Sequence, residues 1–298
     1  VTYGSSAASV ATVNSSTGEV TMVAAGTATI TATVANSSNC EYSTSTATYE
    51  LTVEAAGEDP GSVSNSDFST KILVLGADGM IYVSTSSLSD AKGKATSAGT
   101  VPVGIVSYLG DDAGCTHGLA VALDEGAASA TTMWGGYDNG THFSSPQLTT
   151  DAATAKTDMQ GKSNTSALVE CTTHTGESTS STNTYHHYPA IYCNGYSVDT
   201  SDATTTVTVE ASAGKWFLAS AGQWEKMRTS NGKLFTAEAS GGCGLSGNYW
   251  SSTEYNANNA WNVNSNGLNN NNKNNTNNKV RAVLAYRICT LGATVCIF

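Results

Sequence analysis

The chain has 298 residues, 12% of which are charged, and its formal net charge is -11 at pH 7. This length exceeds that of most single domains, so we expect two. The acidic balance excludes a basic face for the nucleic-acid backbone, and no stretch reaches the roughly 18 apolar residues of a transmembrane helix.

Residues 1–55 contain short alternating or β-branched runs separated by Ser, Asn and Gly. A period of two predicts antiparallel strands, here of a sandwich. The phrase "VATVNSSTGEVTMVAAGTATITATV", followed by "YELTV", resembles the bacterial immunoglobulin-like domain of group 2, a module of cell-surface and phage tail proteins. The resemblance covers the C-terminal two thirds of that module. We therefore expect an N-terminally incomplete domain, with any export or anchoring signal upstream.

The segment "AAGEDPGSVSN" mixes Gly, Pro, Ser and acids without periodicity, which predicts a linker at residues 56–66. A second domain is expected over residues 67–298. It begins with "KILVL" and "MIYVS" around a "GADG" turn, which predicts a hairpin at residues 71–84. Apolar runs predict two more buried strands, at residues 101–109 and 117–124.

Helix signals follow the strands. Residues 149–169 are rich in alanine and carry Thr and Asp start signals, which predict one or two helices. Residues 171–187 are polar and low in complexity, and we expect a long surface loop. A further helix is predicted between a start at Ser220 and a stop at Asn231, because apolar residues recur at helical spacing.

Asparagine fills 14 of the 24 positions from Asn256 to Lys279. Such a run ordinarily indicates a disordered polar tract, yet it lies between "YWSSTEY" and "VRAVLAY", which both predict strands. We expect strands that enclose a long loop or an irregular hairpin. Apolar residues that flank or interrupt the run are expected to be buried and to hold the backbone: Trp250, Trp261, Val263, Leu268, Val280, Ala282 and Val283.

Two segments carry a second resemblance. "GKWFLASAGQWEKM" resembles the "LP-x-x-x-E-W-E" helix of the formylglycine-generating-enzyme branch of the C-type lectin fold, and "GGCGLSGNYWSSTEYNANNAWNVN" with "KVRAV" resembles the end of that fold. Together with the Asn run, residues 67–286 resemble the variable proteins of diversity-generating retroelements. The expected fold class is a mainly β immunoglobulin-like sandwich at the N-terminus, followed by an α+β C-type lectin-fold domain.

The resemblance implies that a reverse transcriptase copies a template repeat, mutates its adenines and overwrites the end of the gene, here about codons 248–283. Asn codons are favoured in such templates, so the asparagines would record genetics rather than chemistry. We expect a hypervariable ligand- or receptor-binding display protein. The residues predicted to be exposed and to contact the ligand are Tyr255, Asn256, Asn258, Asn259, Asn262, Asn264, Asn266, Asn269, Asn270, Asn271, Asn272, Asn274, Asn275, Asn277 and Asn278.

The expected partner is a protein or glycan on a target cell, with no nucleic acid and no direct membrane insertion. The expected location is a virion surface, as on a phage tail, or a bacterial cell surface. An all-Asn surface has few aromatic anchors and should bind weakly, so display of several copies would add avidity; the oligomeric state stays open. The alternative is a surface adhesin or carbohydrate-binding lectin-fold module of fixed specificity, without diversification.

Other chemistry is less favoured. The seven cysteines lack zinc spacing, and we expect small buried hydrophobes with one or two disulfides. The closely spaced Cys289 and Cys296 allow a bridge, but lack the surroundings of copper-dependent oxidases of the formylglycine branch. "WNVN" resembles the calcium-binding "WND" motif of animal C-type lectins without its aspartate. We expect no enzymatic activity, no cofactor and no metal.

The remaining titratable side chains are expected to be structural or solvated. His186 and His187 are adjacent and would point to opposite faces of an extended chain, which favours packing in a loop over a metal or acid–base pair. His117 is expected to be a satisfied structural histidine, and His174 to be solvated. Four acids without a hydrolase pattern are expected to be solvated loop charges: Asp111, Asp112, Asp138 and Glu254.

Overall fold

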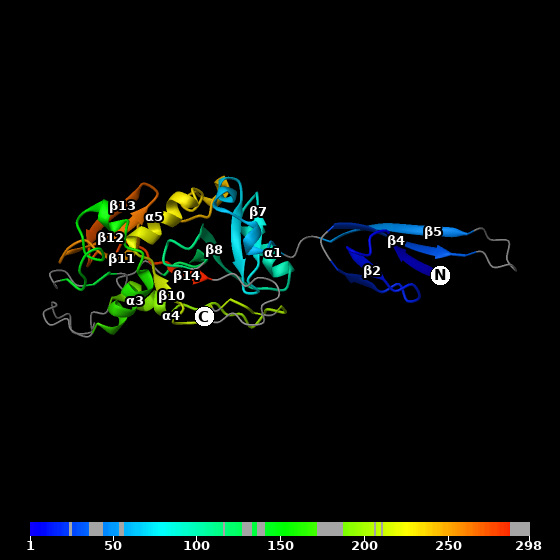
Figure 1. Ribbon diagram of the computed structural model, residues 1–298, viewed down its shortest axis with the longest axis horizontal. Coiled ribbons are helices and arrows are strands. Elements are labelled where there is room, and N and C mark those ends of the chain that lie inside the picture. The colour runs from blue at the N-terminus through cyan, green and yellow to red at the C-terminus, as the bar shows by residue number, and fades with distance from the viewer. Residues whose placement is uncertain are drawn as a thin grey trace. The chain divides into compact units, whose positions relative to one another are not determined.

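The computed structural model describes residues 1–23, 26–35, 44–53, 57–115, 117–126, 133–135, 141–171, 187–205, 207–209 and 211–286. The chain divides into two compact units, Val1–Ala56 and Gly57–Phe298 (Figure 1). Among the described residues, no helix has the length and apolar character needed to cross a membrane.

The first unit is antiparallel β structure, as the alternating pattern predicted. Its strands are β1 (Thr2–Ser5), β2 (Ala11–Val13), β3 (Val20–Met22), β4 (Gly26–Val34) and β5 (Ser45–Val53). One sheet has the order β1-β4-β5, and β2 pairs with β3. Ala28 and Ile30 of β4 point to the same face and are buried together with Ala11. Because alternate side chains of β4 point to the same face, its apolar residues form this small core.

The second unit is built on a six-stranded antiparallel sheet of order β10-β14-β9-β8-β6-β7. Its strands are β6 (Ile72–Gly76), β7 (Ile81–Ser84), β8 (Pro102–Leu109), β9 (Gly118–Ala122), β10 (Trp216–Leu218) and β14 (Ala282–Tyr286). The predicted hairpin at residues 71–84 and the two predicted buried strands are confirmed.

Both faces of this sheet are covered, which explains why its strands read as continuous apolar runs rather than alternating ones. In β6, Leu73 and Leu75 enter one core cluster, and Ile72 and Val74 enter another. At the start of the unit, Glu58 exchanges two backbone hydrogen bonds with Ile81. Part of the segment predicted as a linker therefore packs on the sheet.

The α-helices of this unit are α1 (Leu88–Ser97), α2 (Ala152–Ala155), α3 (Gly161–Glu170), α4 (Tyr188–Gly195) and α5 (Ala221–Ser230), and the short 3-10 helices are η1 (Pro60–Ser62), η2 (Asn65–Ser69) and η3 (Glu238–Ser240). The predicted α2, α3 and α5 are confirmed. The Ser220 hydroxyl accepts from the backbone N–H of Gln223 at the start of α5. Sequence patterns identified neither α1 nor α4.

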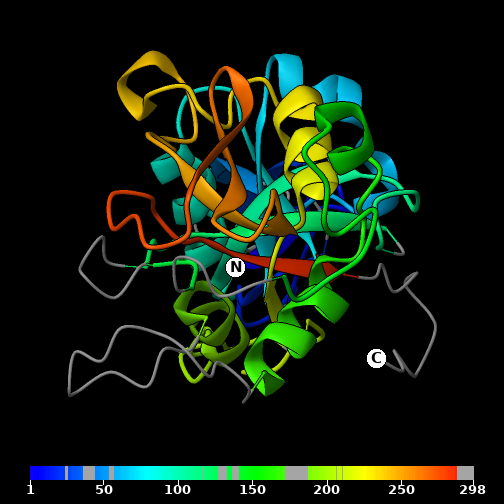
Figure 2. The same ribbon diagram turned by 90° about the vertical axis from the view of Figure 1, so that its left-hand side faces the viewer.

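The middle of the Asn run is a regular β-hairpin. A second antiparallel sheet of order β11-β12-β13 consists of β11 (Tyr249–Glu254), β12 (Asn259–Asn264) and β13 (Gly267–Asn272). Six register pairs join β12 to β13, from Asn259 with Asn272 to Asn264 with Gly267. The expectation of a long loop or irregular hairpin is wrong for residues 259–272, where the backbone pairs without a register shift and leaves a two-residue turn. The rest of the run lies outside the strands. Figure 2 shows the hairpin in orange beside the yellow helix α5.

No disulfide joins any two of the described cysteines, Cys115, Cys171, Cys193 and Cys243. Cys115, Cys193 and Cys243 are buried, as expected for small hydrophobic side chains. The expected one or two disulfides are absent among these four. Cys40 and the pair Cys289 and Cys296 lie outside the described residues.

Candidate functional site

The predicted contact residues are not all exposed. Five of them are: Asn266, Asn269, Asn272, Asn274 and Asn277. Eight more are half-buried: Tyr255, Asn256, Asn258, Asn259, Asn264, Asn270, Asn271 and Asn275. Asn262 and Asn278 have exposed fractions of 1% and 0%. The expectation of exposure is therefore wrong for these two, while the ligand-binding role of the set stays a prediction.

Strand geometry explains the burial of Asn262. Successive side chains of a strand point to opposite faces. On one face of β12, Trp261 packs with Ala155 of α2 and Ala221 of α5. Asn262 faces the other way and lies in register with Trp250 of β11 and Asn269 of β13. The hairpin has neighbours on both faces, so a polar residue in its central strand is buried whichever way it points.

The Asn262 amide has no partner in its buried position. Neither its Oδ1 nor its Nδ2 makes a hydrogen bond to the described residues, and the same is true of Asn258 Oδ1 and Asn278 Nδ2. A buried polar group without a partner costs about 1–3 kcal/mol. Packing alone would therefore favour an apolar residue at position 262.

Other asparagines bond to one another along the hairpin. Asn259 Nδ2 donates to Asn270 Oδ1 at 2.8 Å, and Asn264 Nδ2 donates to Asn248 Oδ1 at 2.8 Å. These are contacts of one side chain with another and do not determine the strand register. The backbone pairs of the hairpin would persist with other side chains at these positions.

The apolar frame lies where it was expected. Trp250, Trp261, Val263, Val280, Ala282 and Val283 are all buried, and Leu268 is half-buried against the same cores. The Trp261 indole N–H donates to the carbonyl of Thr149 at 2.8 Å. The Tyr255 ring meets Trp261 edge-on, with ring centroids 5.0 Å apart. Tyr255 therefore packs in part against the apolar frame.

Beneath the hairpin lies a buried charged group that the sequence analysis missed. Glu254 ends β11 with none of its side chain exposed, and its Oε1 accepts from Lys273 Nζ at 2.8 Å and faces His142 Nδ1 at 2.7 Å. Its Oε2 accepts from the backbone N–H groups of His142 and Phe143. Burial alone would raise the pKa of Glu254, but His142 and Lys273 outweigh it and hold that pKa below its usual value. The expectation that Glu254 is a solvated loop charge is wrong.

His187 extends this group. It is buried at the start of α4, with Nδ1 2.8 Å from the carbonyl oxygen of Trp134 and Nε2 3.2 Å from His142 Nε2. The Trp134 ring also lies under the Lys273 ammonium, 5.1 Å from it. His187 lies 45 positions from His142 in sequence, and Glu254 lies 112 positions from it. No local spacing could have shown this grouping.

The other singled-out polar residues are dispersed. Asp111 is exposed, and Asp112 is exposed and pairs with Lys226 at 2.6 Å. The Nδ1 atom of His117 is buried without a partner among the described residues, so the expectation of a satisfied histidine is wrong for that nitrogen. Asp138, His174 and His186 lie outside the described residues.

The "KVRAV" segment anchors the frame to the main sheet. Arg281 is buried, and its Nε donates to the carbonyl of Ala122 at 2.8 Å. Its Nη1 lies 3.1 Å from Glu125 Oε1, and Lys279 Nζ lies 3.1 Å from Glu125 Oε2. Burial alone would raise the pKa of Glu125, but a hydrogen bond from Tyr249 and the two cations lower it. This network holds the segment after the hairpin against the end of β9.

Comparison with known proteins identifies the N-terminal module. The family description "Bacterial Ig-like domain (group 2)" matches residues 1–45. No curated protein matches the chain. A solved structure that is similar in part is a fimbrial protein from Bacteroides ovatus ATCC 8483, at 15% sequence identity and a TM-score of 0.38, covering 89% of this chain and 58% of that one. The family match thus concerns the N-terminal unit alone.

Proposed function

We propose that this chain is a displayed binding protein, in which an immunoglobulin-like module carries a C-type lectin-fold domain that a retroelement diversifies. The bacterial immunoglobulin-like module at residues 1–45 supports the coarser part of this proposal, a surface protein of adhesin type. The domain binds a protein or glycan on a target cell through the exposed asparagines of its hairpin and of the segment that follows β13. No catalytic step and no cofactor take part.

The observation that carries the diversified part is Asn262. Its amide is 1% exposed and has no hydrogen-bond partner among the described residues, while Trp261 and Val263 on either side of it are packed. Buried polar groups in proteins are almost always paired, because an unpaired one costs stability. Folding stability therefore does not explain an asparagine at position 262. The adenine-rich Asn codon of a retroelement template would explain it.

The hairpin and the residues after it contain two sets of side chains, one buried and apolar and the other exposed asparagine. This division supports the same proposal. A surface that changes needs a backbone whose position does not depend on the changing side chains. Here buried apolar residues and complete backbone pairing hold β12 and β13. The five exposed asparagines can then vary at little cost, since exposed substitutions usually change stability by less than about 0.5 kcal/mol.

The contacts between the resembling segments support the lectin-fold assignment. Trp224, from the "GQWEKM" helix, donates its indole N–H to the carbonyl of Trp250, from the "YWSS" strand, at 3.2 Å. Arg281 of "KVRAV" donates to the carbonyl of Ala122, at the end of β9 in the main sheet. The motifs that carry the resemblance therefore contact one another or the main sheet.

A fixed-specificity surface adhesin is the second candidate, and the immunoglobulin-like module favours it equally. The two candidates differ in their DNA. Under our proposal, a reverse transcriptase gene lies near this gene, together with a near-copy of codons 248–283 that differs only at adenines. A locus that contains neither would overturn diversification and leave the fixed adhesin.

The binding site itself is tested on the protein. Asn269, Asn272, Asn274 and Asn277 would be randomised in a display library of the full chain, with Asn266 kept to preserve the turn. Selection against surface proteins and glycans should yield folded binders whose sequences differ at these positions. A library randomised at four exposed positions of α1, Ser89, Lys92, Gly93 and Lys94, is the matched control. Equal recovery of binders from both libraries would argue against the hairpin as the site.

A further inference from the structure

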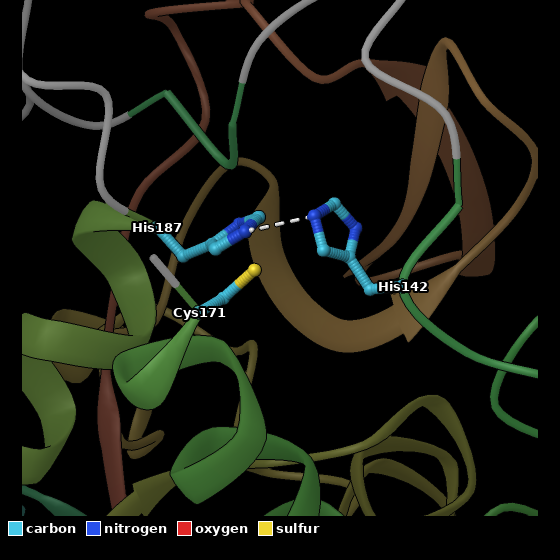
Figure 3. A group of neighbouring side chains, drawn as sticks. All are labelled: His142, Cys171 and His187. Atoms are coloured by element: carbon cyan, nitrogen blue, oxygen red, sulfur yellow. Dashed lines mark hydrogen bonds between the residues drawn. The ribbon is translucent and has the colours of Figure 1, made fainter. Parts of the chain in front are cut away.

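Three potential metal ligands converge beneath the hairpin, from three separate segments. His142 lies in the loop before α2, Cys171 caps the C-terminus of α3, and His187 caps the N-terminus of α4. One ligand atom from each lies within 4.8 Å of the other two. Figure 3 shows the Cys171 sulfur directed toward the space between the two imidazole rings.

The hydrogen bonds of the two rings determine which nitrogens face each other without a proton. His187 Nδ1 lies 2.8 Å from the Trp134 carbonyl oxygen, which can only accept, so Nδ1 carries the hydrogen. His142 Nδ1 lies 2.7 Å from Glu254 Oε1, which also binds the Lys273 ammonium and is therefore an ionised acceptor. In the neutral rings both Nε2 atoms then carry lone pairs, and they lie 3.2 Å apart.

Two lone pairs at this distance repel unless a positive species lies between them. A proton held between the two Nε2 atoms in a hydrogen bond is the alternative to a metal ion, and it does not involve the Cys171 sulfur that lies beside both rings. A zinc ion uses all three groups, because it takes imidazole nitrogen and thiolate sulfur, and a water molecule would complete its tetrahedral geometry. We infer that His142, Cys171 and His187 form a zinc site.

The surroundings have the features of metal-binding histidines. Such ligands donate their second ring N–H to a carboxylate or a backbone carbonyl, which orients the ring. His142 does so to Glu254, and His187 does so to Trp134. The sulfur lies at the C-terminus of α3, where the helix dipole favours a cation. Neither Cys171 nor the His142 side chain, which is 11% exposed, is fully buried.

The role that follows is structural. The ion would join the end of α3, the start of α4 and the loop at His142, and Glu254 would link that loop to Lys273 in the hairpin segment. The site therefore braces the base of the β11–β13 sheet. It does not depend on whether the hairpin is diversified, and it differs from the expectation that the chain binds no metal.

Cobalt and zinc titration of the full, metal-free chain tests the site. We expect one equivalent of Co²⁺ to produce the visible bands of tetrahedral cobalt and a near-ultraviolet thiolate-to-cobalt band, both lost when Zn²⁺ is added. Cys171→Ser should lose the thiolate band and weaken zinc binding by more than about 100-fold. Glu254→Gln should weaken it by about 10- to 100-fold, since it removes only the orienting carboxylate.

Cys115→Ser is the matched control, because Cys115 is a buried cysteine outside this group, and it should titrate as the parent chain does. Zinc should raise the unfolding temperature of the parent and of Cys115→Ser, but not that of Cys171→Ser, whose fold is checked by circular dichroism. Absence of zinc binding by the parent chain would overturn the inference. An unchanged thiolate band in Cys171→Ser would overturn it as well.

Discussion

Lys273 and Glu254 form an ion pair inside the protein, with Nζ 2.8 Å from Oε1 and exposed fractions of 1% and 0% for the two side chains. Lys273 directly follows β13 within the Asn run, and Glu254 ends β11. The pair therefore fastens the far end of the hairpin to the strand before it.

Removing one partner of this pair should be costly. Lys273→Met leaves Glu254 buried and without its cation, and we expect a loss of about 3–5 kcal/mol in the free energy of unfolding. Urea denaturation of the full chain measures this loss from the unfolding of its second unit. The double variant Lys273→Met with Glu254→Gln should lose less than the sum of the two single variants, because neither charge is then stranded. Lys92→Met, at an exposed position of α1, is the control; a similar loss there would contradict the argument.

Asn262 should be a position where an apolar residue stabilises the protein. Asn262→Val removes a buried amide without partners and places a β-branched residue in a strand, so we expect a gain of about 1–3 kcal/mol in unfolding free energy. Asn272→Val, at an exposed position of β13, should change stability by less than about 0.5 kcal/mol. A loss of stability in Asn262→Val would show that its amide has an unseen role.

The two sets of hairpin residues should respond differently to substitution. Trp261→Ala creates a cavity beside Ala155 and Ala221 and breaks the hydrogen bond to Thr149, and we expect a loss of about 3–5 kcal/mol. Replacing Asn269, Asn274 and Asn277 together by serine should leave the thermal unfolding midpoint within a few degrees of the parent. If the serine variant unfolds as readily as Trp261→Ala, the asparagines belong to the frame after all.

Glu125 should make the stability depend on pH in a defined direction. Its folded pKa lies below the ordinary value of 4.5, so its ionised form stabilises the protein above that pH, and this contribution is lost as pH falls through the folded pKa. Glu125→Gln should be less stable than the parent near neutral pH, and the difference should shrink below about pH 4.5. Asp202→Asn, at an exposed position, is the control. A constant difference across the pH range would exclude this linkage.

Local patterns predicted much of the fold. Continuous apolar runs identified β6, β8 and β9, and the Ser220 start with its helical spacing identified α5, because these signals depend on neighbours a few positions away. The same logic failed for α4, which follows a polar segment, and for the hairpin β12–β13, where asparagine has neither strand preference nor alternation.

By itself, the sequence determined most strands of both units, the buried apolar frame around the Asn run and the segments whose resemblance suggested its origin. Only the tertiary structure decided which asparagines face solvent, and that Glu254 and Lys273 meet inside the protein. It also brought His142, Cys171 and His187 together. Burial and pairing of polar groups depend on which distant segments pack against each other, and no spacing along a single chain records those partners.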